Sequence, residues 1–216
     1  MKRTFRSLPV ALVLLLAGCS SAYYGAMEKM GVAKREILGD RVEKTRVAQT
    51  EAKQQFTDAL QRFQAVTKTD GGDLQKKYDE LNREFQRSET RAKEVRSRIE
   101  SVEDVARAMF VEWKKELAQY TNVTLRADSQ RQLDATQKRY EALLAVMRRA
   151  ADRMDPVLAT FRDQVLYLKH NLNARALAQL DATNRTLEAD ISRLVADMET
   201  SIREAETFIK ELKTIP

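Results

Sequence analysis

The sequence predicts an all-α protein, an elongated antiparallel bundle of three to four long helices with coiled-coil-like packing. Only six glycines and three prolines occur in 216 residues, so tight turns are few and the regular elements must be long. Charged residues make up 32% of the chain and aromatic residues 6%, a composition typical of amphipathic helices rather than β-sheets. Apolar residues also recur at alternating steps of three and four, the spacing of a coiled-coil seam.

Residues 1–18 predict a secretory signal peptide. Lys2, Arg3 and Arg6 precede the apolar run "LPVALVLLLA", residues 8–17. A run of about ten residues is half of the roughly twenty that span a bilayer, so it indicates a signal peptide and not a transmembrane helix. Because the three basic residues leave with the signal, the net charge falls from +6 to +3, and we expect no nucleic-acid partner.

The end of the apolar run predicts a lipid anchor. Leu16, Ala17, Gly18 and Cys19 resemble the lipobox of bacterial lipoproteins, [LVI]-[ASTVI]-[GAS]-C, at every position. In such proteins the chain is cut before the cysteine, here between Gly18 and Cys19, the thiol carries a diacylglycerol, and the new amino group is acylated. Two or more acyl chains hold a soluble domain on a bilayer. A catalytic or metal-binding Cys19 would have no second cysteine to act with, and the lone histidine, His170, lies far along the chain.

The same resemblance predicts a location in the bacterial cell envelope. We expect residues 19–26 to form a lipidated tether and residues 27–216 a helical domain. Ser20 follows the cysteine where many Gram-negative inner-membrane lipoproteins have Asp. This favours a location on the outer membrane, with the body facing the periplasm. Attachment to the inner membrane is the alternative. Tyr23 and Tyr24 either rest at the membrane interface or pack the first helix against the bundle.

Four apolar seams divide the helical domain into segments of about forty residues, each roughly 60 Å long as a helix. The seams comprise Leu38, Val42, Thr45, Gln49, Ala52, Phe56, Ala59, Phe63 and Val66; Leu74, Tyr78, Leu81, Phe85, Ser88, Ala92, Val95, Ile99, Val102, Ala106, Met109 and Trp113; Tyr140, Leu144, Met147, Ala151, Met154, Leu158, Phe161, Val165, Leu168 and Leu172; and Leu180, Asn184, Leu187, Ile191, Leu194, Met198, Ser201, Ala205, Phe208 and Leu212. A lone amphipathic helix cannot bury its stripe, so we expect the segments to pack on one another. The pattern leaves homo-oligomerisation open.

Two breaks between the segments carry turn signals. The stretch "KTDGGD", residues 68–73, holds two glycines and predicts a turn, with Asp73 as the N-cap of the next helix. The stretch "YTNVTLRADS", residues 120–129, is a weaker signal, marked by β-branched residues, with Asp128 and Ser129 as candidate caps.

The last part of the chain has less certain boundaries. The stretch "KHNLNA", residues 169–174, contains neither Gly nor Pro, so it predicts either a short turn or one continuous helix. Asp155 and Pro156 could cap and begin a new helix. Because the heptad phase is unchanged across Pro156, we favour a kink within one helix.

Residue groupings that carry chemistry are sparse, and the sequence predicts no enzyme, cofactor or metal site. No G-x-x-x-x-G-K-[ST] motif is present. His170 lacks the Glu-x-x-His partner of carboxylate-bridged metal bundles and is expected at a helix end or in packing. Arg83, Arg87 and Arg91 share one helix face and could meet lipid head groups, glycan phosphates or an acidic protein. Acidic neighbours favour a solvated face instead.

Two segments carry a family resemblance. The stretches "YYGAMEKMGVAKREILGDRVEKTRVAQTEAKQQF", residues 23–56, and "FRDQVLYLKHNLNARA", residues 161–176, resemble the DUF2959 family of bacterial proteins of unknown function. The resemblance implies a helical envelope lipoprotein and supplies no activity or functional residue. A looser likeness is to the major outer-membrane lipoprotein that links membrane to peptidoglycan. That protein ends in Lys, whereas this chain ends in Lys-Thr-Ile-Pro, so the likeness does not extend to covalent wall attachment.

Two functions fit these observations. The first is a lipid-anchored, non-enzymatic structural or protein-interaction module of the envelope, with an unidentified envelope protein as partner. The alternative is a bundle that binds a lipid or a small apolar ligand between splayed helices near Pro156. Met147, Met154, Phe161 and Tyr167 would then line the binding site, since methionine and aromatic side chains suit such surfaces.

Overall fold

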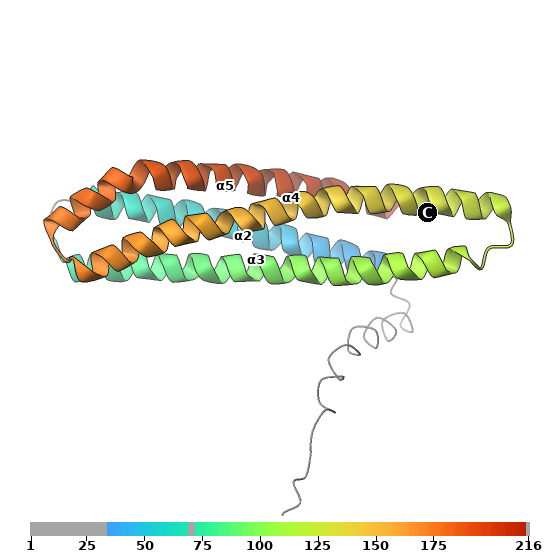
Figure 1. Ribbon diagram of the computed structural model, residues 1–216, viewed down its shortest axis with the longest axis horizontal. Helices are drawn as coiled ribbons and strands as arrows, with labels where there is room; N and C mark the ends of the chain where they lie inside the picture. The colour runs from blue at the N-terminus through green and yellow to red at the C-terminus, as the bar shows by residue number, and fades with distance from the viewer. Residues whose placement is uncertain (1–33, 69–71, 215–216) are drawn as a thin grey trace, which may run out of the picture.

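The described residues form a bundle of four long helices. The computed structural model describes residues 34–68 and 72–214, which form α2 (Lys34–Thr67), α3 (Leu74–Leu117), α4 (Val123–His170) and α5 (Ala174–Thr214). Successive helices run in opposite directions along one long axis (Figure 1). The predicted all-α class and the division into four segments are confirmed, and the described residues contain no strand.

The four helices close into a ring. α2 packs against α3 and α5, and α4 packs against the same two helices. The first and last described helices are therefore neighbours, as in an up-down-up-down bundle with short connections. Each helix has two partners and can cover a broad apolar stripe from both sides.

The predicted seams form the core. Every seam residue of α2 and α5 is buried, and the α3 seam is buried from Leu81 to Met109. The side chains at the ends of the α3 seam, Leu74, Tyr78 and Trp113, are partly buried. Burial of one continuous stripe along each helix supplies the main driving force for folding.

The buried stripe is wider than a strict heptad predicts. Val105 and Phe110 of α3 are buried although neither belongs to the predicted seam, and in α4 Leu143 is buried where Leu144 was expected. A straight helix drifts relative to a 3.5-residue repeat, and a helix with two neighbours buries more than its a and d positions. Leu172 is exposed because it follows the end of α4.

The turn between α2 and α3 has the predicted chemistry. Asp73 is the N-cap of α3, and its side chain accepts a hydrogen bond from the backbone N–H of Lys76 at 3.1 Å. Gly72 has a φ of +87°, in the region that favours glycine. The predicted break between the two helices and the Asp73 cap are confirmed.

The predicted caps of the next helix are wrong. Asp128 and Ser129 lie inside α4, and its N-cap is Asn122. The Asn122 side chain accepts hydrogen bonds from the backbone N–H groups of Thr124 and Leu125 at 3.0 and 3.1 Å. Asn caps as well as Asp or Ser does, so the helix begins at the first available cap despite the β-branched residues that follow.

The end of α4 settles the remaining boundaries. α4 continues through Pro156, so no new helix begins there, and the kink stays a prediction from the missing proline N–H. A short turn separates His170 from α5, which starts at Ala174. The Asn173 side chain accepts a hydrogen bond from the backbone N–H of Ala176 at 3.0 Å, which supports the start of α5.

One buried hydrogen bond joins the first and last helices. Ser201 of α5 donates its hydroxyl to Gln49 Oε1 of α2 at 2.9 Å, and both residues are completely buried. Within the described residues, Gln49 Nε2 has no hydrogen-bond partner. Because the two polar side chains meet at only one relative position of α2 and α5, their bond selects the register of that interface.

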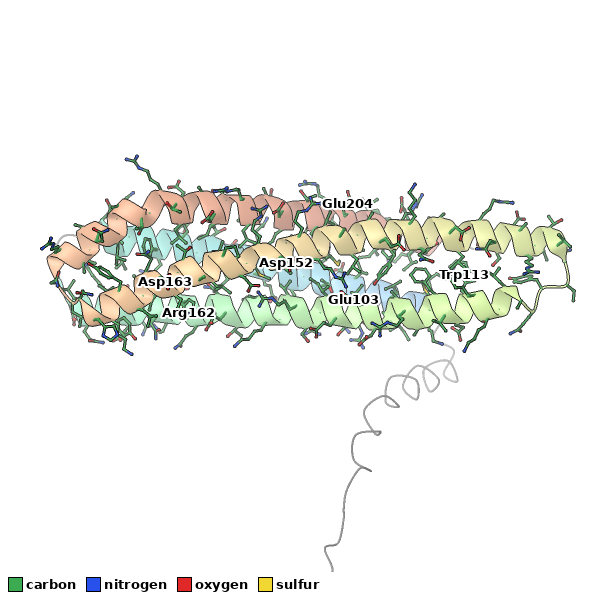
Figure 2. All side chains as sticks on the ribbon, in the orientation of Figure 1. Glu103, Trp113, Asp152, Arg162, Asp163 and Glu204 are labelled. Atoms are coloured by element: carbon green, nitrogen blue, oxygen red, sulfur yellow. The ribbon has the colours of Figure 1, made fainter. Side chains whose placement is uncertain are left out.

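Ion pairs edge all four helix interfaces. Arg91 contacts Glu51 at 2.7 Å between α2 and α3, and Lys53 contacts Glu199 at 3.3 Å between α2 and α5. Glu103 lies between α3 and α4 (Figure 2), where Arg148 contacts it at 2.8 Å. The α4–α5 edge carries the pairs Arg153–Asp197 and Arg139–Glu211. Each exposed pair contributes at most about 1 kcal/mol, but together they favour this antiparallel pairing.

An aromatic cluster closes the core near the α2–α3 turn. The ring of Phe161 meets Phe63 and Phe85 edge-on, with centroid distances of 6.2 and 5.9 Å. The Arg162 guanidinium lies 5.6 Å from the centre of the Phe85 ring. The cluster joins side chains from α2, α3 and α4 in the favourable edge-to-face geometry.

The Gln49–Ser201 bond predicts a non-additive pair of substitutions. Ser201→Ala leaves the buried Gln49 amide without any partner and should lower the free energy of unfolding by about 1–2 kcal/mol. Adding Gln49→Leu should recover that loss, because the unpaired buried amide is then removed. Urea unfolding of the two single variants and the double variant measures the coupling. Equal losses that simply add would show that the hydrogen bond has no role.

Candidate functional site

The predicted lipidation site lies outside the described residues. Gly18, Cys19, Tyr23 and Tyr24 all precede the start of α2. The described part of the chain does fix where this segment joins the bundle. Lys34, the first residue of α2, donates its ammonium to the Glu112 carboxylate at 2.9 Å, close to the end of α3. The N-terminal segment therefore enters at the end of the bundle that carries the α3–α4 turn.

The α3–α4 turn projects beyond the other two helices. Figure 1 shows both helices of this hairpin continuing past the start of α2 and the end of α5. The ion pair between Arg139 and Glu211 agrees, because α4 begins several turns before Arg139 whereas α5 ends soon after Glu211. We refer to residues 111–129 as the hairpin tip.

Apolar side chains are exposed on the hairpin tip. Val123, the first residue of α4, is 81% exposed. The other large apolar side chains exposed there are those of Val111, Tyr120 and Leu125. The tip thus carries half of the eight large apolar side chains that are exposed in residues 34–68 and 72–214.

The hairpin tip is held together by contacts of its own. Trp113 lies between α3 and α4 (Figure 2), and its Nε1 donates a hydrogen bond to Ser129 Oγ at 2.9 Å. The rings of Phe110 and Tyr140 lie 5.5 Å apart below it. Because this support is packed and hydrogen-bonded, the exposed apolar residues stand on a defined scaffold.

A second exposed apolar group lies at the opposite end. Leu166, Tyr167 and Leu172 are exposed around the α4–α5 turn, and we call them the far-end patch. Tyr167 is tied to this turn, since its carbonyl accepts a hydrogen bond from Asn171 Nδ2 at 3.0 Å. His170 is the exposed last residue of α4, so its expected place at a helix end is confirmed.

The arginine row is a solvated face, as its acidic neighbours predict. Arg83, Arg87 and Arg91 line a shallow groove of about 620 Å³ on the outside of α3. Arg87 contacts Glu84 at 3.0 Å, and Arg91 contacts Glu51 at 2.7 Å. These pairs reduce the positive field that an anionic ligand would need.

Among the described residues, no group of three His, Cys, Asp or Glu side chains could hold a metal ion.

The residues expected to line an apolar ligand site are packed together. Met147 and Met154 are fully buried, Phe161 belongs to the aromatic cluster, and Tyr167 lies on the surface away from them. A ligand at this place would have to displace core side chains. A groove of about 730 Å³ lies instead between α2 and α5, lined by Arg35, Glu36, Gly39, Asp40, Glu43, Ile209, Leu212 and Lys213.

Contacts within the bundle shift the pKa of the Tyr140 phenol and the pKa of the Glu43 carboxyl group. Burial, with a smaller contribution from Glu103, raises the pKa of Tyr140 to about 12. Hydrogen bonds from Arg46, at 2.7 and 2.8 Å, lower the pKa of Glu43. Both shifts arise from burial and contacts within the bundle.

The described helices include none long and apolar enough to cross a membrane. Together these features define an elongated, closed four-helix bundle with a packed core and apolar side chains exposed at both ends.

The sequence profile of the family described as "Protein of unknown function (DUF2959)" matches residues 23–212. The chain therefore belongs to the DUF2959 family, and the predicted resemblance is confirmed. No curated protein and no solved structure matches the chain.

The raised pKa of Tyr140 predicts a loss of stability at high pH. The folded chain holds this phenol proton with a pKa of about 12, against about 10 when unfolded, so the stabilisation is complete below pH 10 and is lost as pH rises through 12. Tyr140→Phe should lack this component of the loss. Urea unfolding between these pH values, with tyrosinate absorbance as a second readout, tests it. Parallel losses in wild type and variant would contradict the prediction.

Proposed function

We propose that this protein is a lipid-anchored module of the bacterial envelope that faces the periplasm and acts without enzymatic activity. The observation that carries the proposal is the match of Leu16 to Cys19 to a lipobox, followed directly by a long helical bundle. Acylation at Cys19 would hold the bundle on the outer membrane through its N-terminal segment. That segment enters at the end that bears the hairpin tip, so the far-end patch faces away from the anchor.

The length of the bundle supports a role in protein interaction. At about 1.5 Å per residue, helices of 34 to 48 residues extend roughly 50–70 Å. The far-end patch is thus held well away from the attachment point. Exposed apolar side chains grouped in this way are typical of interaction surfaces. We infer that the bundle acts as a spacer that presents Leu166, Tyr167 and Leu172 to an envelope protein, with a second copy of the chain as the other candidate partner.

The chemistry of the described side chains supports a non-enzymatic role. His170 stands at a helix end, Arg87 and Arg91 are engaged in ion pairs, and the shifted pKa values follow from packing. The two arginines share a solvated groove on α3, and His170 lies apart from them at the end of α4.

The groove between α2 and α5 favours one alternative, the binding of a lipid or small apolar ligand. Ile209 and Leu212 supply apolar surface there, but five charged residues surround them. Such a rim suits the head group of a lipid better than a wholly apolar molecule. Native mass spectrometry of the purified protein separates the two functions, because a retained ligand adds mass, and the bare chain mass would remove this alternative.

Loss of the cysteine should release the protein from the membrane. In cells given an alkyne-labelled fatty acid, the wild type should be labelled and sediment with membranes, whereas Cys19→Ala should be unlabelled and lose the anchor. Cys19→Ser is the closest control for side-chain size. Equal labelling of wild type and Cys19→Ala, or a soluble and unlabelled wild type, would refute lipid attachment.

The far-end patch should crosslink to a discrete partner. A photoreactive phenylalanine at Tyr167 replaces a 40% exposed side chain, and the same residue at Val47, 41% exposed on the side of α2, is the matched control. We expect an adduct of defined mass from position 167 and none from position 47. An adduct of twice the chain mass would identify self-association. The absence of a specific adduct at 167 would contradict the interaction role.

A further inference from the structure

We propose that the hairpin tip inserts into the phospholipid bilayer that anchors Cys19. The apolar side chains of Tyr120, Val123 and Leu125 would enter the interfacial layer, and the bundle would stand with its far-end patch directed away from that membrane. This inference rests on the proposed lipid attachment and adds a second membrane contact to it. The occupant of the tip is an anionic phospholipid surface.

The position of the tip supports this assignment. The 15 residues from Cys19 to Lys34 reach at most about 50 Å, and Lys34 contacts Glu112 on α3. From Glu112 the helix continues only to Leu117, a rise of about 8 Å, before the turn. The tip therefore lies close to the point where the tether enters. When the bundle stands upright on the tip, the far-end patch lies a full bundle length away from that bilayer.

The chemistry of the tip suits an anionic bilayer surface. Exposed Lys114, Lys115 and Arg126 flank the apolar side chains, and the hairpin tip also holds Glu112, Glu116 and Asp128. Glu112 is paired with Lys34 and Asp128 with Arg131, so Glu116 is the acidic residue that offsets the three basic ones. Basic residues are attracted to anionic head groups, while tyrosine is favoured at the membrane interface. The basic side chains would therefore contact the anionic head groups, and the apolar side chains would enter the interfacial layer.

The fold itself does not need the exposed apolar side chain of Val123. Asn122 caps α4 through its own side chain, and Val123 next to it is 81% exposed. A polar residue at this position would leave the cap and the core unchanged. The three apolar side chains would bind a membrane only weakly on their own. Once a lipid anchor holds the protein at the surface, the insertion becomes intramolecular and its effective concentration rises greatly.

An environment-sensitive fluorophore tests the contact in the full-length acylated protein. Acylation blocks Cys19, the only native cysteine, so Val123→Cys and Leu172→Cys each provide one free thiol for labelling with nitrobenzoxadiazole. Leu172 is the matched control, since it is an exposed leucine in the turn at the opposite end. The labelled proteins are reconstituted into vesicles of phosphatidylethanolamine and phosphatidylglycerol.

The proposal predicts a difference between the two positions. The label at position 123 should show severalfold higher, blue-shifted emission and quenching by nitroxide-bearing lipids, while the label at 172 stays accessible to aqueous iodide. The double variant Lys114→Glu and Lys115→Glu should reduce the response at 123 on phosphatidylglycerol vesicles and not on phosphatidylcholine. Equal water exposure at the two positions would overturn the proposal. Protection of position 123 in native envelopes but not in vesicles would also overturn it and indicate a protein partner.

The same samples separate failure of this inference from failure of the proposed function. Mass spectrometry of the N-terminal peptide reports whether Cys19 is acylated. An acylated protein with a water-exposed label at 123 retains the lipid anchor and refutes the inserted tip. An unmodified Cys19 refutes the anchor. The label at 123 in the Cys19→Ala background, where position 123 carries the one thiol, then reports whether the tip binds vesicles without the anchor.

Discussion

The whole structure depends on covering one broad apolar stripe on each of four helices. A stripe that exceeds the a and d positions cannot be buried by a single partner, so each helix needs two neighbours. A ring is the simplest arrangement that gives each helix two neighbours. It brings α2, the first described helix, against α5, the last. The Gln49–Ser201 bond then lies inside that final interface, where it selects one register among those that burial alone would allow.

Closure of the ring leaves few large apolar side chains exposed along the sides of the bundle. The apolar stripes face inward, and acidic and basic side chains pair along all four edges. Surface left for interaction is concentrated where the helices stop. Because α3 and α4 are longer than α2 and α5, one end carries the projecting hairpin tip, while the other carries the far-end patch beside the α4–α5 turn.

The two ends have different relations to the N-terminal segment. The contact of Lys34 with Glu112 joins that segment to the hairpin end. A lipid anchor would therefore give the symmetric-looking bundle a direction, with one apolar end beside the bilayer and the other presented outward. Under the proposed lipid anchor, a rod with its two ends in different surroundings would suit a spacer or adaptor.

The sequence by itself determined the features that depend on neighbours along the chain. The heptad seams, the Asp73 cap and the turn at Gly72 follow local spacing and turn chemistry, and the lipobox and the family likeness are read from adjacent residues. Only the tertiary structure decided the burial of Leu143 in place of Leu144 and the packing of Met147 and Met154. It also decided which apolar residues remain exposed, because exposure at Val123 and Tyr167 depends on where other helices end, and that is a relation between segments far apart in the chain.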